Sequence, residues 1–393
     1  MIASFLRLMI DSLSAKSLPI FEVPGHSISS ARIARNTAWS AFASAHPDLR
    51  FTGMQLAHAV VKADHLDYAN PTLPGIGFLL QSHRIIDWSS PQLCLRPGAS
   101  TLLTDFVRTS MAGRIGQGLA LLFMQSKGYA QAMHLHAYLE SRCIRTSDGA
   151  GRRQPVADFL CEGPAAARAL AESKASFAKR TNEPSEVKQR LKSALVEQVE
   201  PWMGKISPPA TKGFVIATYL RECSDSSADD SALVFVDPED QNGSNEVEVP
   251  SVTVRRENYA AWLSAMGLQD AGARLRDRRI DEGRRVTFAV IDTANGEFAF
   301  PSLCCIAFPG DERPSISFDT KCMAAGIEFR VLRAIAQAVQ GDEAALVTYQ
   351  YQYHDEPLQA RRDESKTFSI FPDGTFLGTV DFGQIVRIEE FVL

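Results

Sequence analysis

The alternation of apolar and polar positions predicts a run of regular elements in the middle of the chain. Apolar residues recur at helical spacing in two stretches, and shorter runs alternate or are β-branched as strands are. Gly163-Pro164 separates two of the predicted strands and marks a turn. The elements are a helix at 102–129, strands at 130–144, 156–162 and 165–177, a helix at 183–202 and a strand at 212–223. Their order is α-β-β-β-α-β.

The flanks divide the chain into further predicted parts. Residues 1–100 are predicted as a mostly helical N-terminal region of unknown role, with helices at 27–46 and 52–66. The core spans 101–222. Residues 222–254 hold nine acidic residues and no Lys or Arg, so 223–251 is predicted as an acidic linker or insertion. The remainder, 252–393, is predicted as a C-terminal α/β domain.

Composition adds constraints on the setting of the protein. A chain of 393 residues favours two or three domains. Its net charge of −5 argues against a surface that is positively charged throughout but is compatible with a local basic groove. The seven cysteines include no C-x-x-C pair, so neither a zinc site nor a disulfide framework is expected. With no apolar run long enough to span a membrane, we expect a reduced, cytoplasmic protein without a membrane contact.

Candidate chemistry lies in the stretch PVADFLCEGPAAARALAESKASF, residues 155–177. A hairpin centred near Ala165 places Asp158 opposite Glu172, since the two are equidistant from it, and cross-strand neighbours lie about 5 Å apart at Cβ. Lys174 shares a strand face with Glu172 because successive side chains alternate. Two carboxylates so close repel unless a cation lies between them, and Mg²⁺ prefers such oxygen ligands.

The Glu-Ser-Lys triplet is not specific by itself. The chain has four acid-x-Lys triplets, and only this one follows an acid in its own apolar strand across a turn. The alternative interpretation makes Asp158 a polar residue at a strand end and Glu172 and Lys174 a solvated cross-strand face. The surrounding order of elements favours the metal site.

These residues and elements resemble the PD-(D/E)xK nuclease superfamily. The resemblance covers about 105–222 and implies a restriction-endonuclease-like core, an α/β (α+β) fold with a central mixed β-sheet flanked by helices. It implies that Asp158, Glu172 and the main-chain carbonyl of Ser173 hold Mg²⁺, with Mn²⁺ as a substitute, and that Lys174 assists the attacking water.

The resemblance also implies supporting residues on the two helices. The first helix commonly supplies a Glu, where this chain has Gln117. The second helix often supplies a Gln, Lys or Arg, for which Lys188, Gln189 and Gln198 are candidates. Basic residues near the site are predicted to contact nucleic acid: Arg152, Arg153, Lys179, Arg180, Lys188 and Arg190.

The predicted function is that of a metal-dependent nuclease, a phosphodiester hydrolase with DNA as the expected substrate. Restriction, repair or anti-phage defence are the settings that the family suggests. The alternative is a non-catalytic scaffold or nucleic-acid-binding protein that keeps the nuclease fold, and Gln117 leaves it open. Homodimerisation, or a protein partner bound through the N- or C-terminal region, also stays open.

Other motifs give weaker predictions. The GRIGQG stretch, residues 113–118, lacks the spacing of a phosphate loop, so close helix packing is expected there. His134 and His136 would share a strand face, but no third metal ligand accompanies them. The arginines between 274 and 285 alternate with acids, so they predict nucleic-acid contact only weakly. The Pro-Asp-Gly sequence in FPDGTF near the C-terminus is typical of a turn between strands.

Overall fold

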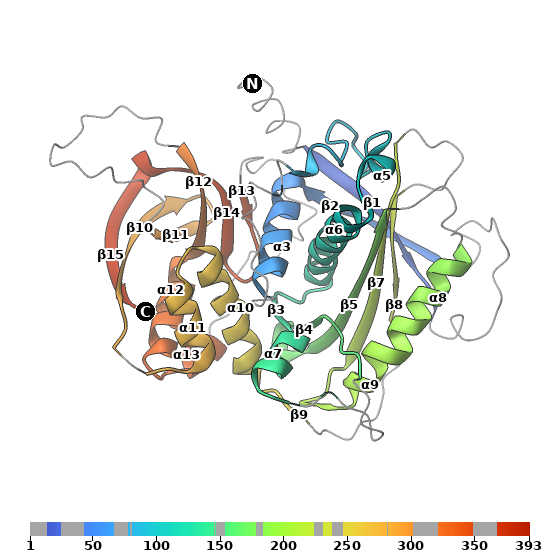
Figure 1. Ribbon diagram of the computed structural model, residues 1–393. Coiled ribbons are helices and arrows are strands. Elements are labelled where there is room, and N and C mark those ends of the chain that lie inside the picture. The colour runs from blue at the N-terminus through green and yellow to red at the C-terminus, as the bar shows by residue number, and fades with distance from the viewer. Residues whose placement is uncertain are drawn as a thin grey trace.

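The protein is described by a computed structural model in which regular elements cover most of the chain. The described residues are 14–24, 43–66, 78, 81–144, 146, 154–177, 184–223, 231–237, 247–280, 282–301, 321–348 and 368–393. Within them, two larger sheets and the helices between and around them form the fold (Figure 1).

The larger sheet has seven strands in the order β2-β1-β8-β7-β5-β4-β3. Its strands are β1 (Ala15–Glu22), β2 (Ser44–Thr52), β3 (Gln131–His134), β4 (Phe159–Glu162), β5 (Arg168–Phe177), β7 (Lys212–Leu220) and β8 (Ala232–Val236). β1 and β8 pair in parallel, as do β5 and β7, and the other neighbours are antiparallel. The predicted central mixed sheet flanked by helices is therefore confirmed.

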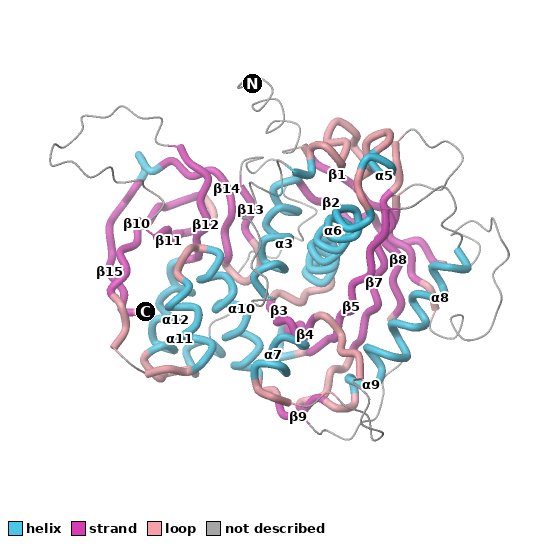
Figure 2. Tube along the Cα trace, viewed as in Figure 1, coloured by secondary structure: helices cyan, strands magenta, loops and turns pink. Residues whose placement is uncertain are grey.

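Helices cover both faces of this sheet, and alternation along β5 shows which residues face which layer. Ala169 and Ala171 pack in one core cluster with α3 (Gly53–Leu66) and α6 (Asp105–Ser126). Leu170 packs in another cluster on the opposite face. That second layer comprises α7 (Leu135–Ser141), α8 (Pro184–Ala194), the π-helical turn η3 (Leu195–Val199) and α9 (Glu200–Met203). Figure 2 shows the two helical layers on either side of the strands.

The smaller sheet is antiparallel, in the order β13-β14-β12-β11-β10-β15. Its strands are β10 (Arg285–Thr293), β11 (Gly296–Pro301), β12 (Lys321–Glu328), β13 (Phe368–Ile370), β14 (Thr375–Asp381) and β15 (Ile385–Val392). The accompanying helices are α10 (Ser251–Ala265), α11 (Gln269–Asp277), α12 (Phe329–Val339) and α13 (Ala344–Thr348). The short elements are α5 (Ala99–Leu102), η2 (Pro164–Ala166), η5 (Phe382–Gln384) and the parallel pair β6 (Ile206–Ser207) with β9 (Val247–Glu248).

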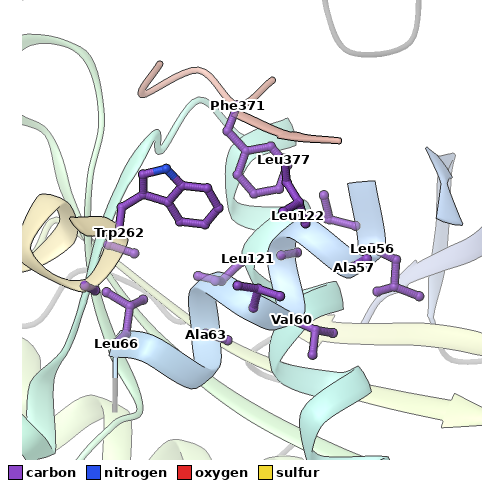
Figure 3. Close-up of a cluster of buried hydrophobic side chains, with 14 of the residues drawn as sticks. Leu56, Ala57, Val60, Ala63, Leu66, Leu121, Leu122, Trp262, Phe371 and Leu377 are labelled. Carbon is purple, nitrogen blue, oxygen red and sulfur yellow. The ribbon is translucent and has the colours of Figure 1, made fainter. Parts of the chain in front are cut away.

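One apolar cluster joins the two sheets. In Figure 3, Trp262 of α10, Phe371 after β13 and Leu377 of β14 surround α3, together with Leu121 and Leu122 of α6. All are buried. Since burial of such side chains stabilises a fold by about 1.5–3 kcal/mol each, this cluster ties the C-terminal sheet to the core.

The structure corrects several predicted boundaries. Residues 44–46, predicted as the end of a helix, lie in β2, and the rest of that prediction before residue 43 is outside the described part of the chain. The N-terminal region supplies β1 and β2 to the main sheet, and the acidic segment supplies β8, so the boundaries at 100 and 222 do not divide it. Strand pairing has overridden local propensity here.

The predicted strand at 130–144 is also only partly correct. β3 ends at His134, whose ring accepts a hydrogen bond from the Ala137 N–H at 3.2 Å and caps α7. The chain turns into a helix there because the cap satisfies a free helix-end donor. The predicted helices at 52–66, 102–129 and 183–202 correspond to α3, α6 and the α8–α9 run.

Candidate active site

The β4–β5 hairpin brings the two predicted carboxylates together. Phe159 pairs with Ala171 and Glu162 with Arg168, so the register continues to Asp158 opposite Glu172, as predicted. Asp158 lies directly before β4. Its N–H donates to Glu172 Oε2 at 3.0 Å, and its Oδ2 accepts from the Ser173 N–H at 2.9 Å. Each of the two carboxylates therefore accepts a hydrogen bond from a backbone N–H of the opposite segment at the end of the hairpin.

Lys174 completes the group from the same face of β5. Its Nζ lies 2.5 Å from Glu172 Oε1. The Glu172 side chain is 1% exposed, whereas that of Lys174 is 39% exposed. The carboxylate is thus held inside the fold, and the ammonium group lies between it and solvent.

Burial makes both carboxyl groups hard to ionise, and the charge of Glu172 adds to this effect at Asp158. Burial, and then the negative charge of Glu172, raise the pKa of Asp158 from 3.8 to about 7, against the opposing effects of His134, the Ser173 N–H and Lys174. Burial also raises the pKa of Glu172, and the Lys174 ammonium opposes this rise. Strong shifts from burial and a like charge are typical of functional sites.

Beyond Ala171, no described strand pairs with β5 on the side of β4. β4 pairs with β5 only as far as Ala171, while β5 continues to Phe177. The Ser173 N–H points to that edge, since it donates to Asp158. Because the N–H and C=O of a strand residue point to the same side, the Ser173 carbonyl is directed to the edge too, as its predicted ligand role requires.

Among the helix residues, the structure brings Gln198 to the site. It lies in the π-helical turn η3, donates from Nε2 to the Val156 carbonyl at 3.3 Å and opposes the rise in the pKa of Glu172. Gln189 and Arg190 are exposed on α8, and the Lys188 side chain lies outside what the structure describes. The sequence could not rank these candidates, because a π-helical turn changes which positions face the sheet.

Gln117 lies on α6, on the other face of the sheet. A Cβ at the neighbouring Gly116 would stand 2.3 Å from Ala175 Cβ and 3.4 Å from Ser173 Oγ. α6 therefore packs on the face of β5 that carries Ser173 and Ala175, opposite to Glu172 and Lys174. Close helix packing therefore explains Gly116, as expected, but not Gly113, where an added Cβ would have nothing within 4 Å.

Several other predicted residues are not brought to the site or are not described. Arg152, Arg153, Lys179 and Arg180 lie outside the described residues. His134 and His136 do not share a strand face, because His136 belongs to α7. Four of the arginines between 274 and 285 are paired with acids, in the contacts Arg276–Glu257, Arg278–Glu343, Arg279–Asp277 and Arg285–Glu390.

A disulfide between Cys94 and Cys223 was not expected from the sequence. The two cysteines are 129 residues apart, with Cα atoms at 5.5 Å. Backbone hydrogen bonds of Leu95 to the segment that follows β7 lie beside the disulfide. The Leu95 N–H donates to the Arg221 carbonyl at 2.6 Å, and the Leu95 carbonyl accepts from the Cys223 N–H at 3.0 Å. Asp87, Cys94 and Cys223 form the one three-ligand group found among the described residues, and it holds no second carboxylate.

A buried polar network near the C-terminus was also missed. Asp373, in the stretch predicted only as a turn, is fully buried and forms an ion pair with Lys62 of α3. Asn258 Nδ2 donates to Asp373 Oδ2 at 2.8 Å. His58, also buried, stacks on Phe371 with ring centroids 3.7 Å apart. A buried charge needs a partner, so Asp373 could have been suspected from its apolar surroundings, but its partner could not.

Comparison with known proteins gives no relative for this chain. No protein-family model, curated protein or solved structure matches it. Across the residues that the structure describes, we find no helix with the length and apolar character needed to cross a membrane.

Proposed function

We propose that the chain is a Mg²⁺-dependent nuclease that hydrolyses phosphodiester bonds, with DNA as the expected substrate. The observation that carries the proposal is the convergence of Asp158, Glu172 and Lys174 at the edge of β5, beyond the last residue that pairs with β4. The α-β-β-β-α-β order supports a restriction-endonuclease-like core, embedded here in a wider sheet. Restriction, repair or anti-phage defence would be the setting of such an enzyme.

A divalent cation fits the donor set at this edge. Asp158 and Glu172 supply carboxylate oxygens, and the Ser173 carbonyl points to the same side. The raised pKa of Asp158 reflects in part the charge of Glu172, a repulsion that a cation between the two would relieve. Hard oxygen ligands of this kind suit Mg²⁺, with Mn²⁺ as a substitute.

Glu172 and Lys174 would have different roles in hydrolysis. A divalent ion bound here would lower the pKa of a coordinated water and polarise the phosphate. Glu172 is positioned by the Asp158 N–H and by Lys174, and Gln198 opposes the rise in its pKa. The Lys174 ammonium is partly exposed, so its positive charge would face an incoming phosphate and stabilise the charge that develops during hydrolysis.

A non-catalytic scaffold or nucleic-acid-binding protein is the second candidate. It is favoured by the position of Gln117 on the far face of β5 and by the absence of a third carboxylate beside Asp158 and Glu172 among the described residues. In that case Lys174 neutralises Glu172, and the site has only a structural role.

The test is cleavage of plasmid and single-stranded DNA with Mg²⁺ or Mn²⁺. We expect wild-type cleavage that EDTA abolishes, and a loss of about 100-fold or more in Asp158→Asn and Lys174→Gln, since each removes a group that acts on the reacting atoms. The exposed Asp292→Asn is the matched control. Equal cleavage by wild type and both site variants would refute the proposal.

Thermal stability separates the two candidates when no substrate is known. A ligand of the folded state raises the melting temperature, so Mg²⁺ should stabilise wild type at pH 8 and leave Asp158→Asn unchanged. A wild type that gains nothing from Mg²⁺ or Mn²⁺ would favour the scaffold.

A further inference from the structure

The C-terminal strand β15 forms an exposed edge of the smaller sheet. Among the described strands it pairs only with β10, and it ends the strand order on that side (Figure 1). Its outward-facing apolar side chains are unusually exposed, with Val386 at 59% and Ile388 at 67%. Long edges with apolar side chains are pairing sites unless they are covered.

The hydrogen bonding of β15 shows which of its backbone groups point away from β10. Arg284 and Leu393 exchange both backbone bonds, at 2.9 and 3.0 Å. In an antiparallel pair such positions alternate, so residues 387, 389 and 391 bond toward β10. The N–H and C=O groups of Ile388 and Glu390 therefore point to the open edge.

The side chains at this edge divide between two faces. Arg387 lies over the Phe329 ring, 4.5 Å from its centroid, and so faces the helices, as Glu389 does two residues later. Arg387 Nε donates to Glu389 Oε1 at 2.7 Å. Ile388 and Glu390 lie on the opposite face, where Ile388 is opposite Ala289 of β10.

We propose that β15 is the pairing surface of a symmetric homodimer, in which two copies join their smaller sheets by antiparallel β15–β15 contact centred on Ile388. Residues directly opposite each other in two paired strands lie on the same face of the sheet, and side chains alternate between faces along each strand. With a two-fold axis perpendicular to the sheet, an odd-numbered residue can therefore pair only with an odd-numbered one, and an even-numbered residue only with an even-numbered one. Centring on Ile388 places each Arg387 opposite Glu389 of the other copy and the two Ile388 side chains against each other.

Neighbouring registers are excluded by charge. Centring on Arg387 would oppose two arginines, and centring on Glu389 would oppose two glutamates, and like charges directly opposite destabilise a sheet. The Ile388 register instead makes an alternating ring of Arg387 and Glu389 from both copies. It also makes Ile388 and its counterpart a hydrogen-bonded pair, which matches the N–H and C=O groups that point away from β10 at that position. Of the registers centred on residues 387, 388 and 389, charge complementarity thus favours the one centred on Ile388.

A second copy fits this edge better than an unrelated partner for a specific reason. The strand segment from Arg387 to Glu389 is complementary to itself in the antiparallel direction, which an arbitrary protein strand is not. Val386 would face Glu390, whose carboxylate remains exposed and 3.9 Å from Arg285. Since pairing occurs along one edge only, the interface is of the small, reversible kind.

The test is sedimentation velocity of the full chain over a range of concentrations. We expect a monomer–dimer equilibrium, with Ile388→Lys raising the dimer dissociation constant about tenfold or more because it places two ammonium groups at the axis. Ile280→Lys is the matched control, since Ile280 is 76% exposed but lies outside the strands. It should leave dimerisation unchanged.

A second variant gives a positive signal. Oxidation should link Ile388→Cys into dimers faster than Ile280→Cys, because only the first lies on the axis, at a spacing of about 5.5 Å between Cα atoms. Wild type that stays monomeric at about 100 μM, well above a Kd of about 10 μM, would overturn the proposal. So would a dimer that survives Ile388→Lys, or one that Ile280→Lys dissociates equally.

Discussion

Replacing Asp158 by Asn should stabilise the metal-free protein more at pH 8 than at pH 5. The pKa of Asp158 is raised in the folded protein from 3.8 to about 7, so the folded state holds a proton that the unfolded state has released. The stability from this proton is fully present below about pH 4 and is lost as pH rises through about 7. Asn keeps the oxygen that accepts from the Ser173 N–H but cannot ionise.

The structure bounds the size of the effect. The difference between 3.8 and about 7 corresponds to about 4 kcal/mol, at about 1.4 kcal/mol for each tenfold change in proton affinity. Relaxation of Lys174 and entry of water reduce this value, so we expect a gain of about 2–4 kcal/mol in the free energy of unfolding at pH 8. At pH 5 the folded carboxyl group is still protonated, but the unfolded one, with its ordinary pKa of 3.8, is already largely ionised, so the gain should be smaller, about 1–2 kcal/mol.

Urea unfolding in EDTA, followed by tryptophan fluorescence at both pH values, measures these differences. Asp292→Asn serves as the control, because Asp292 is exposed on β10 and its substitution should change stability by less than about 0.5 kcal/mol. If wild type and Asp158→Asn lose stability equally between pH 5 and pH 8, or if the variant is the less stable at pH 8, the argument from burial and repulsion is wrong.

Two further predictions concern packing and the buried ion pair, and both can be checked by urea unfolding at pH 7. Gly116→Ala should lower the free energy of unfolding by about 1–3 kcal/mol, because its Cβ would lie 2.3 Å from the Ala175 Cβ. Gly113→Ala, with nothing within 4 Å of the added Cβ, should raise it by up to about 1 kcal/mol. Equal effects of the two substitutions would contradict the close contact of α6 with β5. Lys62→Met should lower the free energy of unfolding by about 3–5 kcal/mol, because it leaves the Asp373 carboxylate buried without its ion-pair partner. Adding Asp373→Leu should recover part of that loss. If the double variant loses as much stability as the two single variants together, the pair is not coupled.

The sequence determined the hairpin and the two acids that meet across it. Gly163-Pro164 gives a short turn, and equal distances from Ala165 set the register that places Asp158 opposite Glu172. Alternation within β5 then places Lys174 on the face of Glu172. These are local relations, fixed by the two-residue period of a strand and by the length of one turn. The sequence could therefore predict them.

Only the tertiary structure decided what surrounds the hairpin. β8 comes from a segment that looks like an acidic linker, because a short apolar strand becomes stable only between β1 and β7. Gln198 reaches Glu172 through a π-helical turn, and Gln117 is turned to the other face by the packing of Gly116. Asp373 is held by Lys62 from a distant helix. Each depends on partners far apart in the chain, and pairing at that distance leaves no periodic signal in the sequence.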